Sequence, residues 1–312
     1  MTVLERCESR PGRLVEGSLH TASVGAAREL PDDARPPAYV QESHIRTART
    51  VREDGLFVPT WIGTAFDIPG HIELDVLQGA LESWMLRHET LRSGFRWAGD
   101  EMRRFTLDEG AVALHREDVG EFADPVTLTR YLQDRFDVAA DALTWPNFLF
   151  AAVVRDDGAS LYMAFDHSNV DAYSIHRITA EIHELYAAGL DGRAVEAQPV
   201  ASYVDFCASE RTDADLIDDT HTVVGRWREF IARCDGRLPN FPVDLGLNPE
   251  GPLPEQKFIQ EMLVDAEGAA AFEAYCRPYG GTLVGVVAAV ALDARDISGL
   301  GVYRNRRPFH PR

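Results

Sequence analysis

Residues 148–174 read FLFAAVVRDDGASLYMAFDHSNVDAYS, and this stretch decides the fold. Two apolar runs, FLFAAVVR (148–155) and SLYMAF (160–165), flank the turn letters DDG at 156–158. An Asp-Gly pair between two apolar runs is a strong signal for a β-hairpin. A polar loop follows, and apolar residues at helical spacing then predict a helix over about 173–188. The stretch therefore predicts two buried strands, a loop and a helix.

The rest of the chain alternates between predicted strands and helices. Before residue 148 we expect strands at 60–66 and 91–97, with helices at about 72–90 and 126–136. After the linker-like residues 189–200 we expect helices at 222–234, 267–275 and 283–295, and a strand at 257–264. Residues 1–35 are polar with scattered proline and glycine, and we expect them to be loosely ordered or strand-like. This alternation predicts an α/β fold.

The composition is that of an ordinary globular protein: 312 residues, 45% hydrophobic, with a formal net charge of -19. An acidic surface repels nucleic acid and anionic membranes, because binding either depends on neutralising phosphates. The longest apolar run, at 283–292, is too short to cross a bilayer, and no apolar leader opens the chain. We expect a cytoplasmic protein with no nucleic-acid partner and no membrane span. The cysteines form no CxxC pair and are expected to be reduced thiols: Cys7, Cys207, Cys234 and Cys276.

The polar loop DHSNVDAYS, residues 166–174, is the sharpest candidate for chemistry. It places His167 at the end of a buried strand, with Asp171 four residues later. A loop held between a strand and a helix can present an imidazole rigidly, and histidine suits general-base work near neutral pH. A second HxxxD, His71 with Asp75, begins a predicted helix, where acidic residues are favoured in any case. We interpret that second copy as structural.

Other kinds of site have weaker support in the sequence. His176 and His183 lie on one predicted helix, but no carboxylate spacing accompanies them, so we expect no metal site. The glycines at 280–285 and 299–301 lack the pattern of a dinucleotide or phosphate-binding loop. We expect neither a metal nor a redox cofactor.

Several ordered segments resemble one known superfamily. AFDHSNVDAYS (164–174) resembles the HHxxxDG core of peptide-synthetase condensation domains, and RHETLRSGFR (87–96) resembles the RHExLRTxF segment that precedes this core. PPAYVQESHI (36–45) resembles the family's opening segment. ASYVDFCASER (201–211) and YRNRRPFHPR (303–312) resemble segments of actinobacterial polyketide-associated acyltransferases of the trehalose-lipid type. From about residue 36 onward the chain is thus similar to the chloramphenicol acetyltransferase and condensation-domain superfamily.

The resemblance implies an acyltransferase of α/β fold, with two lobes of mixed sheets flanked by helices. An acyl thioester, on coenzyme A or a carrier protein, and a hydroxyl or amine acceptor would meet in a tunnel, in lipid or natural-product biosynthesis. His167 matches the family's general base. Asp171 matches a structural aspartate that pairs with an arginine, for which Arg92 is the first candidate and Arg87 the second. The candidates for lining the tunnel are Asp166, Asn169 and Ser174.

Three departures from the family pattern have consequences. The motif's first histidine is Asp166 here, its glycine is Ala172, and the chain ends near the early strand of the second lobe. We therefore expect an N-terminal lobe at 1–195, which carries the HxxxD motif, and a partial C-terminal lobe at 196–312. An incomplete lobe exposes apolar surface and a strand edge, so a second copy of the chain is a candidate partner. A carrier protein is a candidate partner as the bearer of the acyl thioester.

Two further interpretations remain open at this stage. Asp166, Asp171 and Ser174 also fit the DxxxxDxxS pattern of heterocyclisation domains, which are relatives of condensation domains. The two interpretations differ in which side chain points into the tunnel: Asp166 in a heterocyclisation domain, and His167 in an acyltransferase. The third is a catalytically inactive, truncated relative that binds a ligand or partner.

Overall fold

The computed structural model describes residues 4, 9–194, 200–238, 262 and 264–282. Contacts divide the chain into two compact units, and each is described by itself. Val3–Asp218 is the unit that we call the first lobe, and Asp219–Arg312 with Met1–Thr2 form the second unit. The first lobe defined in this way ends at Asp218, and the lobe boundary predicted at residue 195 stays a prediction. The predicted helix at 283–295 lies outside the described residues, as does the predicted strand at 257–264 apart from two positions.

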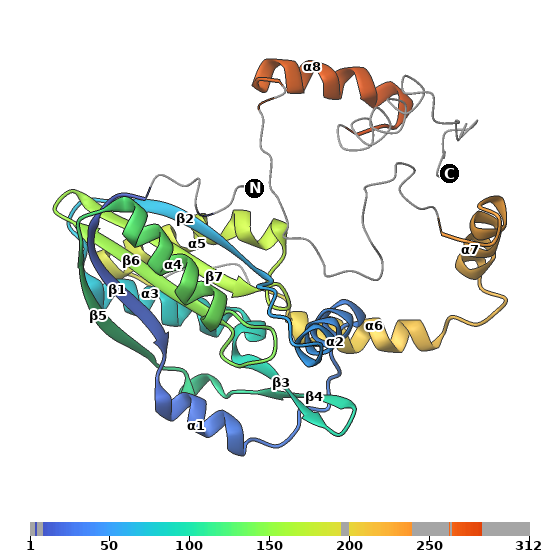
Figure 1. The fold of residues 1–312 in the computed structure, drawn as a ribbon, viewed down its shortest axis with the longest axis horizontal. Coiled ribbons are helices and arrows are strands. Elements are labelled where there is room, and N and C mark those ends of the chain that lie inside the picture. Colours follow the sequence, from blue (N-terminus) through green and yellow to red (C-terminus); the bar gives the residue numbers. More distant parts are fainter. Residues whose placement is uncertain (1–3, 5–8, 195–199, 239–261, 263, 283–312) are drawn as a thin grey trace. The chain divides into compact units, whose positions relative to one another are not determined.

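A five-stranded sheet forms the centre of the first lobe, with the strand order β2-β7-β6-β1-β5 (Figure 1). The bounds of its strands are Gly12–Leu19 (β1), Trp61–Pro69 (β2), Leu114–Phe122 (β5), Phe148–Arg155 (β6) and Gly158–Asp166 (β7). The predicted hairpin is confirmed, with Phe148 opposite Phe165 and Arg155 opposite Gly158. Each pairing between these strands is antiparallel, because hairpins and returning segments connect them, whereas the family resemblance implied mixed sheets.

Glycine is required at the hairpin turn. Gly158 has a φ of +152°, and a Cβ at this position would lie 2.5 Å from the carbonyl oxygen of Ile68 on the neighbouring strand β2. A side chain would therefore push β2 away from β7, and the Asp-Gly sequence allows the three strands to pack closely.

Helices cover both faces of the sheet (Figure 1). Their bounds are Leu74–Arg87 (α3), Pro125–Ala139 (α4) and Ala172–Asp191 (α5). The α3 and α5 helices pack with the Phe148, Phe150 and Phe165 side of the sheet, whereas α4 packs with the Leu149 and Ala151 side. Because both faces are buried, β6 and β7 show continuous apolar runs instead of alternation. The resulting core holds β7 rigidly up to its last residue.

The polar N-terminal stretch is more ordered than the sequence indicated. It forms β1 in the interior of the sheet, between β6 and β5, and then the helix α1 (Thr21–Glu29). Glu16 lies on β1 and is buried. Arg135 of α4 forms an ion pair with its carboxylate at 2.6 Å, and the hydroxyl of Tyr131 of α4 donates a hydrogen bond to it at 2.9 Å. Because a charged residue occupies this inward position, β1 lacks the alternation of apolar and polar residues by which a strand is usually predicted.

A smaller sheet lies beside the first, built from β3 (Ser93–Ala98) and β4 (Glu101–Thr106). Arg104 of β4 is 1% exposed and donates hydrogen bonds to the carbonyls of Arg35 and Pro36 and to Gln41 Oε1. Its guanidinium thereby fixes the start of α2 (Tyr39–Glu53). The helix α6 (Tyr203–Asp215) completes this part of the first lobe.

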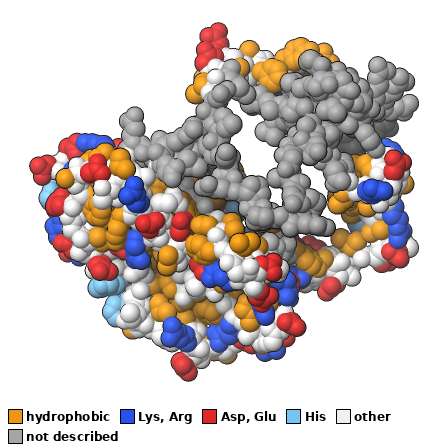
Figure 2. Space-filling model, viewed as in Figure 1, with side chains coloured by type: hydrophobic (Ala, Val, Ile, Leu, Met, Phe, Trp, Pro, Cys, Tyr) orange, Lys and Arg blue, Asp and Glu red, His pale blue; other side chains and the backbone are white. Residues whose placement is uncertain are grey.

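The second unit contains two described helices, α7 (Thr222–Arg233) and α8 (Ala266–Cys276), which confirm the helices expected at 222–234 and 267–275. None of the described helices is both long and apolar enough to cross a membrane. On the face shown in Figure 2, acidic and basic side chains are interspersed and do not form a single acidic patch.

Candidate active site

The loop that follows β7 presents one side chain outward and buries its neighbours. Asp166 is fully buried, His167 is exposed, and Ser168 is buried again. Because β7 is buried along its whole length, the loop starts from a rigid support. The imidazole of His167 is therefore held outward from a fixed backbone, as a base that must reach a substrate requires.

Asp166 fixes this arrangement through its carboxylate. Oδ1 accepts from the backbone N–H of Ser168 at 2.9 Å, and Oδ2 accepts from Thr60 Oγ1 at 2.9 Å. His44 Nε2 of α2 lies 3.0 Å from the same Oδ2. Burial raises the pKa of Asp166, but the hydrogen bonds from His44 and Ser168 outweigh burial and lower it overall. The carboxylate is thus ionised and enclosed by hydrogen-bond donors. Asp166 was expected to line a tunnel, but its side chain is buried within the first lobe.

The next two loop residues are attached to the body of the lobe. Asn169 Nδ2 donates to Asn147 Oδ1 at 2.6 Å, and Asn147 Nδ2 in turn donates to Ser168 Oγ at 3.3 Å. Gln41 Nε2 donates to the carbonyl oxygen of Ser168 at 2.8 Å. Asn169, expected to line the tunnel, is 9% exposed and instead anchors the loop.

Asp171 caps the helix that follows the loop. Its Oδ1 accepts from both the hydroxyl and the backbone N–H of Ser174, each at 2.7 Å. These two hydrogen bonds, first from the hydroxyl and then from the backbone, lower the pKa of the Asp171 carboxyl. Ser174, the third candidate for tunnel lining, is thereby used in the cap. Asp171 keeps a structural role, but that role is to begin α5.

The two arginines expected beside Asp171 pair elsewhere. Arg92 Nη2 lies 3.3 Å from Glu109, and Arg87 Nε lies 3.8 Å from Glu181 of α5. Within the described ranges, no ion pair joins Asp171 to either arginine. The reason is local: α3 and the short helix Glu89–Arg92 direct these side chains toward other carboxylates.

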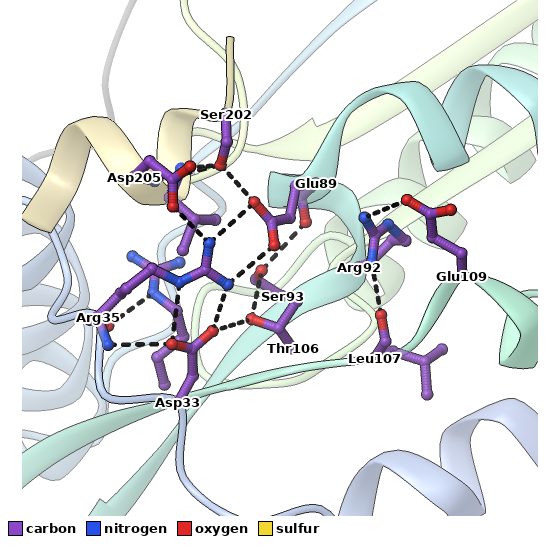
Figure 3. Close-up of polar contacts among 12 residues, drawn as sticks. Asp33, Arg35, Glu89, Arg92, Ser93, Thr106, Leu107, Glu109, Ser202 and Asp205 are labelled. Carbon is purple, nitrogen blue, oxygen red and sulfur yellow. Dashed lines mark hydrogen bonds and ion pairs between the residues drawn. The ribbon is translucent and has the colours of Figure 1, made fainter. Parts of the chain in front are cut away.

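A cluster of polar side chains holds the segment that contains these arginines (Figure 3). Arg35 pairs with Asp33 at 2.6 Å, Glu89 at 2.8 Å and Asp205 of α6 at 2.7 Å. The hydroxyl of Ser202 also donates to Glu89. Burial raises the pKa of Glu89, but the hydrogen bonds from Arg35 and Ser202 give a net lowering. The cluster therefore fastens α6 and the Glu89 segment to the first lobe.

Sequence reasoning missed the residues that support His167 from outside its loop. They are Gln41, His44, Thr60 and Asn147. One signal was present: Gln41 and His44 are three residues apart, on one face of a helix, inside the segment that resembles the family's opening. The contact between His44 and Asp166, 122 positions apart, has no signature in the sequence.

The histidines considered for a metal do not converge. His176 is exposed, and the ring nitrogens of His183 lie 2.9 Å from the carbonyl of Thr179 and 3.1 Å from that of Asp67. In the part of the chain that the structure describes, no three His, Cys, Asp or Glu side chains form a group that could hold a metal ion.

The chain is similar to a known protein family. The family model described as "Condensation domain" matches residues 61–243, which include the whole His167 loop. The chain belongs to the condensation-domain family. The match confirms the resemblance inferred from the sequence motifs.

Two curated members of this family illustrate the relationship. The chain is 27% identical over 303 residues to the trehalose-2-sulfate acyltransferase PapA2 of Mycobacterium tuberculosis, covering 96% of this chain and 63% of PapA2. It is 28% identical over 289 residues to the acyltransferase PapA3 of the same species, covering 90% and 59%. The chain thus spans less than two thirds of the length of these relatives.

Solved structures show a similar fold. A PapA2 acyl transferase structure superposes with a TM-score of 0.81 at 27% identity, over 96% of this chain and 64% of that one. A variant of the starter condensation domain of the rhizomide synthetase RzmA gives 0.53 at 17% identity, over 64% and 48%. The latter supports the fold alone.

Proposed function

We propose that the protein is an acyltransferase that moves an acyl group from a thioester to a hydroxyl or amine, with His167 as the general base. A ring nitrogen of His167 would take the proton of the acceptor as its oxygen or nitrogen attacks the thioester carbonyl. The new bond forms at the carbonyl carbon, the C–S bond breaks, and the thiol leaves. No metal or redox cofactor enters this chemistry.

The observation that carries the proposal is the exposure pattern of the loop. His167 is exposed while both its neighbours are buried and hydrogen bonded. A backbone fixed in this way holds the imidazole in one place, and positioning of the reactants accounts for much of the rate gain in transfers between two bound substrates. Membership of the condensation-domain family supports the same assignment.

The acceptor that we propose to test first is a hydroxyl of a trehalose-type sugar. The relative PapA2 is named for trehalose-2-sulfate, and a further relative of Mycobacterium tuberculosis, PapA1, which is 24% identical over 310 residues, is named for 2'-acyl-2-O-sulfo-trehalose. A natural-product amine or alcohol is the next class. The donor would be acyl coenzyme A or an acyl carrier protein. Because the chain carries a net charge of -19, it would repel an acidic carrier protein unless basic residues cluster locally on its surface.

The burial of Asp166 weighs against heterocyclisation. That reaction would need the first aspartate of DxxxxDxxS to reach the substrate, yet the Asp166 side chain is 0% exposed and bound to three donors. Of Asp166 and His167, the exposed side chain is the imidazole of His167. This contrast supports simple acyl transfer.

The test is an assay of thiol release with a panel of acyl coenzyme A donors, with and without sugar acceptors. We expect release that depends on an acceptor in the wild type and is lost in His167→Ala. His71→Ala is the matched control, because His71 belongs to the other HxxxD and its side chain is 84% exposed. Near-normal turnover in His167→Ala would contradict the base assignment. No transfer from coenzyme A or carrier-bound donors would favour the inactive, ligand-binding interpretation.

A further inference from the structure

Beside His167 lies a second imidazole, that of His44, which comes from α2 and not from the HxxxD loop. We propose that His44, held by Asp166, is a second proton-transfer residue, which gives a proton to the leaving sulfur while His167 takes the proton of the acceptor. This inference rests on the proposed acyl transfer. It assigns to the Asp166 position a chemical reason for departing from the motif's histidine.

The first argument is proximity. The ring centroids of His44 and His167 lie 6.2 Å apart, with their planes at 57°. The attacking atom and the leaving sulfur are bonded to the same carbon, and each must come within about 3 Å of its proton-transfer partner. Two rings at this separation can lie on either side of such a carbon. The His44 side chain is 23% exposed, so solvent, and hence a ligand, can reach it.

The second argument is the orientation of the His44 ring. The ionised Asp166 carboxylate can only accept, so Nε2 of His44 donates to it. The described residues offer Nδ1 no hydrogen-bond partner. The nitrogen opposite the carboxylate is therefore the one left to meet a substrate, as in a carboxylate-oriented histidine in which one nitrogen is fixed and the other reacts.

The third argument is charge. The carboxylate of Asp166 is completely buried, and a buried carboxylate is stabilised when a cation is paired with it. The other two donors to this carboxylate, Thr60 Oγ1 and the Ser168 N–H, are neutral. His44 is thus the one donor to this carboxylate whose side chain can carry a proton to a leaving thiolate.

The protons balance over one turnover. The acceptor loses its proton to His167, the acceptor atom bonds to the carbonyl carbon, and the C–S bond breaks. The departing sulfur takes its proton from Nδ1 of His44 and leaves as a thiol. His167 is then protonated and His44 neutral, and water returns the proton from His167 to His44 before the next turnover.

The test uses a leaving group that needs no proton. In His44→Gln the amide can still donate to Asp166, but it cannot transfer a proton. With acyl coenzyme A, whose thiol is weakly acidic, we expect kcat/KM to fall by about 100-fold or more, the usual contribution of a general acid. With the 4-nitrothiophenyl thioester of the same acid, we expect a loss of about fivefold at most, because that thiolate leaves unprotonated.

A matched control separates this role from a loss of structure. His88 is also a partly buried histidine paired with a carboxylate, at 24% exposure and 2.6 Å from Glu181. In His88→Gln any loss should be the same with both donors. An equal loss with both donors in His44→Gln, or no loss with either, would overturn the inference. If the inference about His44 fails in this way, the proposed function still stands when the wild type transfers the acyl group and His167→Ala does not. If the wild type transfers from neither donor, the proposed function and the inference about His44 are both overturned.

Discussion

Replacing Asp171 by alanine tests whether this residue works as a helix cap or as the partner of an arginine. The structure shows a cap, with two hydrogen bonds of 2.7 Å from Ser174 at the start of α5. Loss of an N-cap costs about 1 kcal/mol, and at most about 2. Removing one partner of a buried ion pair costs about 3–5 kcal/mol instead. The free energy of unfolding therefore distinguishes the two roles.

The design is a double-mutant cycle with Arg92, the arginine expected to pair with Asp171. Arg92 donates to the carbonyl of Leu107 at 2.7 Å, and Arg92→Ala should cost about 1.5–3 kcal/mol through this charged hydrogen bond. Because the two residues share no contact, we expect their effects to add within about 0.5 kcal/mol. Urea unfolding of the wild type, both single variants and the double variant measures this coupling.

Serine at position 171 is the matched control, because it can cap the helix without a negative charge. Asp171→Ser should recover most of the stability lost in Asp171→Ala. The pKa of Asp171 is lower in the folded protein than in the unfolded chain. Its charge therefore stabilises the fold at pH values above the unfolded pKa, and this stabilisation is lost as the pH falls through the folded pKa. The difference between wild type and Asp171→Ala should therefore shrink in acid. A coupling above about 1 kcal/mol with Arg92 would refute the cap as the main role.

Two other predictions concern the first lobe. Arg35→Ala should lower its stability by about 2–3 kcal/mol, less than for a fully buried pair because Arg35 is 29% exposed. The pKa values of Asp33 and Glu89 are lowered, so this loss should be largest above their unfolded values and diminish in acid; urea unfolding at pH 7 and pH 3.5 checks the sign. Burial raises the pKa of the Cys207 thiol, so a thiol reagent should label Cys207 more slowly than the partly exposed Cys234. Mass spectrometry measures the two labelling rates, and equal rates would contradict the burial of Cys207.

The sequence predicted the part of the fold whose signals are local. The hairpin was visible because two buried strands flank an Asp-Gly turn, and α5 because its apolar residues recur at helical spacing. These two elements enclose His167, so the centre of the candidate site could be located.

The remainder depends on pairings that no local pattern records. For residues 1–35 the sequence left a strand and a loosely ordered segment as alternatives, because the charged residue Glu16 of β1 faces the core, where Arg135 compensates its charge. The support of His167 by His44 was missed because α2 and β7 meet only in the folded chain. The pairing expected between Asp171 and Arg92 came from the family pattern, and the short helix Glu89–Arg92 directs Arg92 toward Glu109 instead.

The interior position of β1 also bears on how the chain is synthesised. Gly12–Leu19 pairs with β5 and with β6, and β6 ends only at Arg155. During translation β1 leaves the ribosome before both of its neighbours, and neither neighbour is complete until more than about a hundred further residues have been added. At about 5–20 residues per second it waits for several seconds with both edges open. A chaperone that shields nascent chains would thus raise the yield of folded protein, and slow codons placed before β6 would lower it.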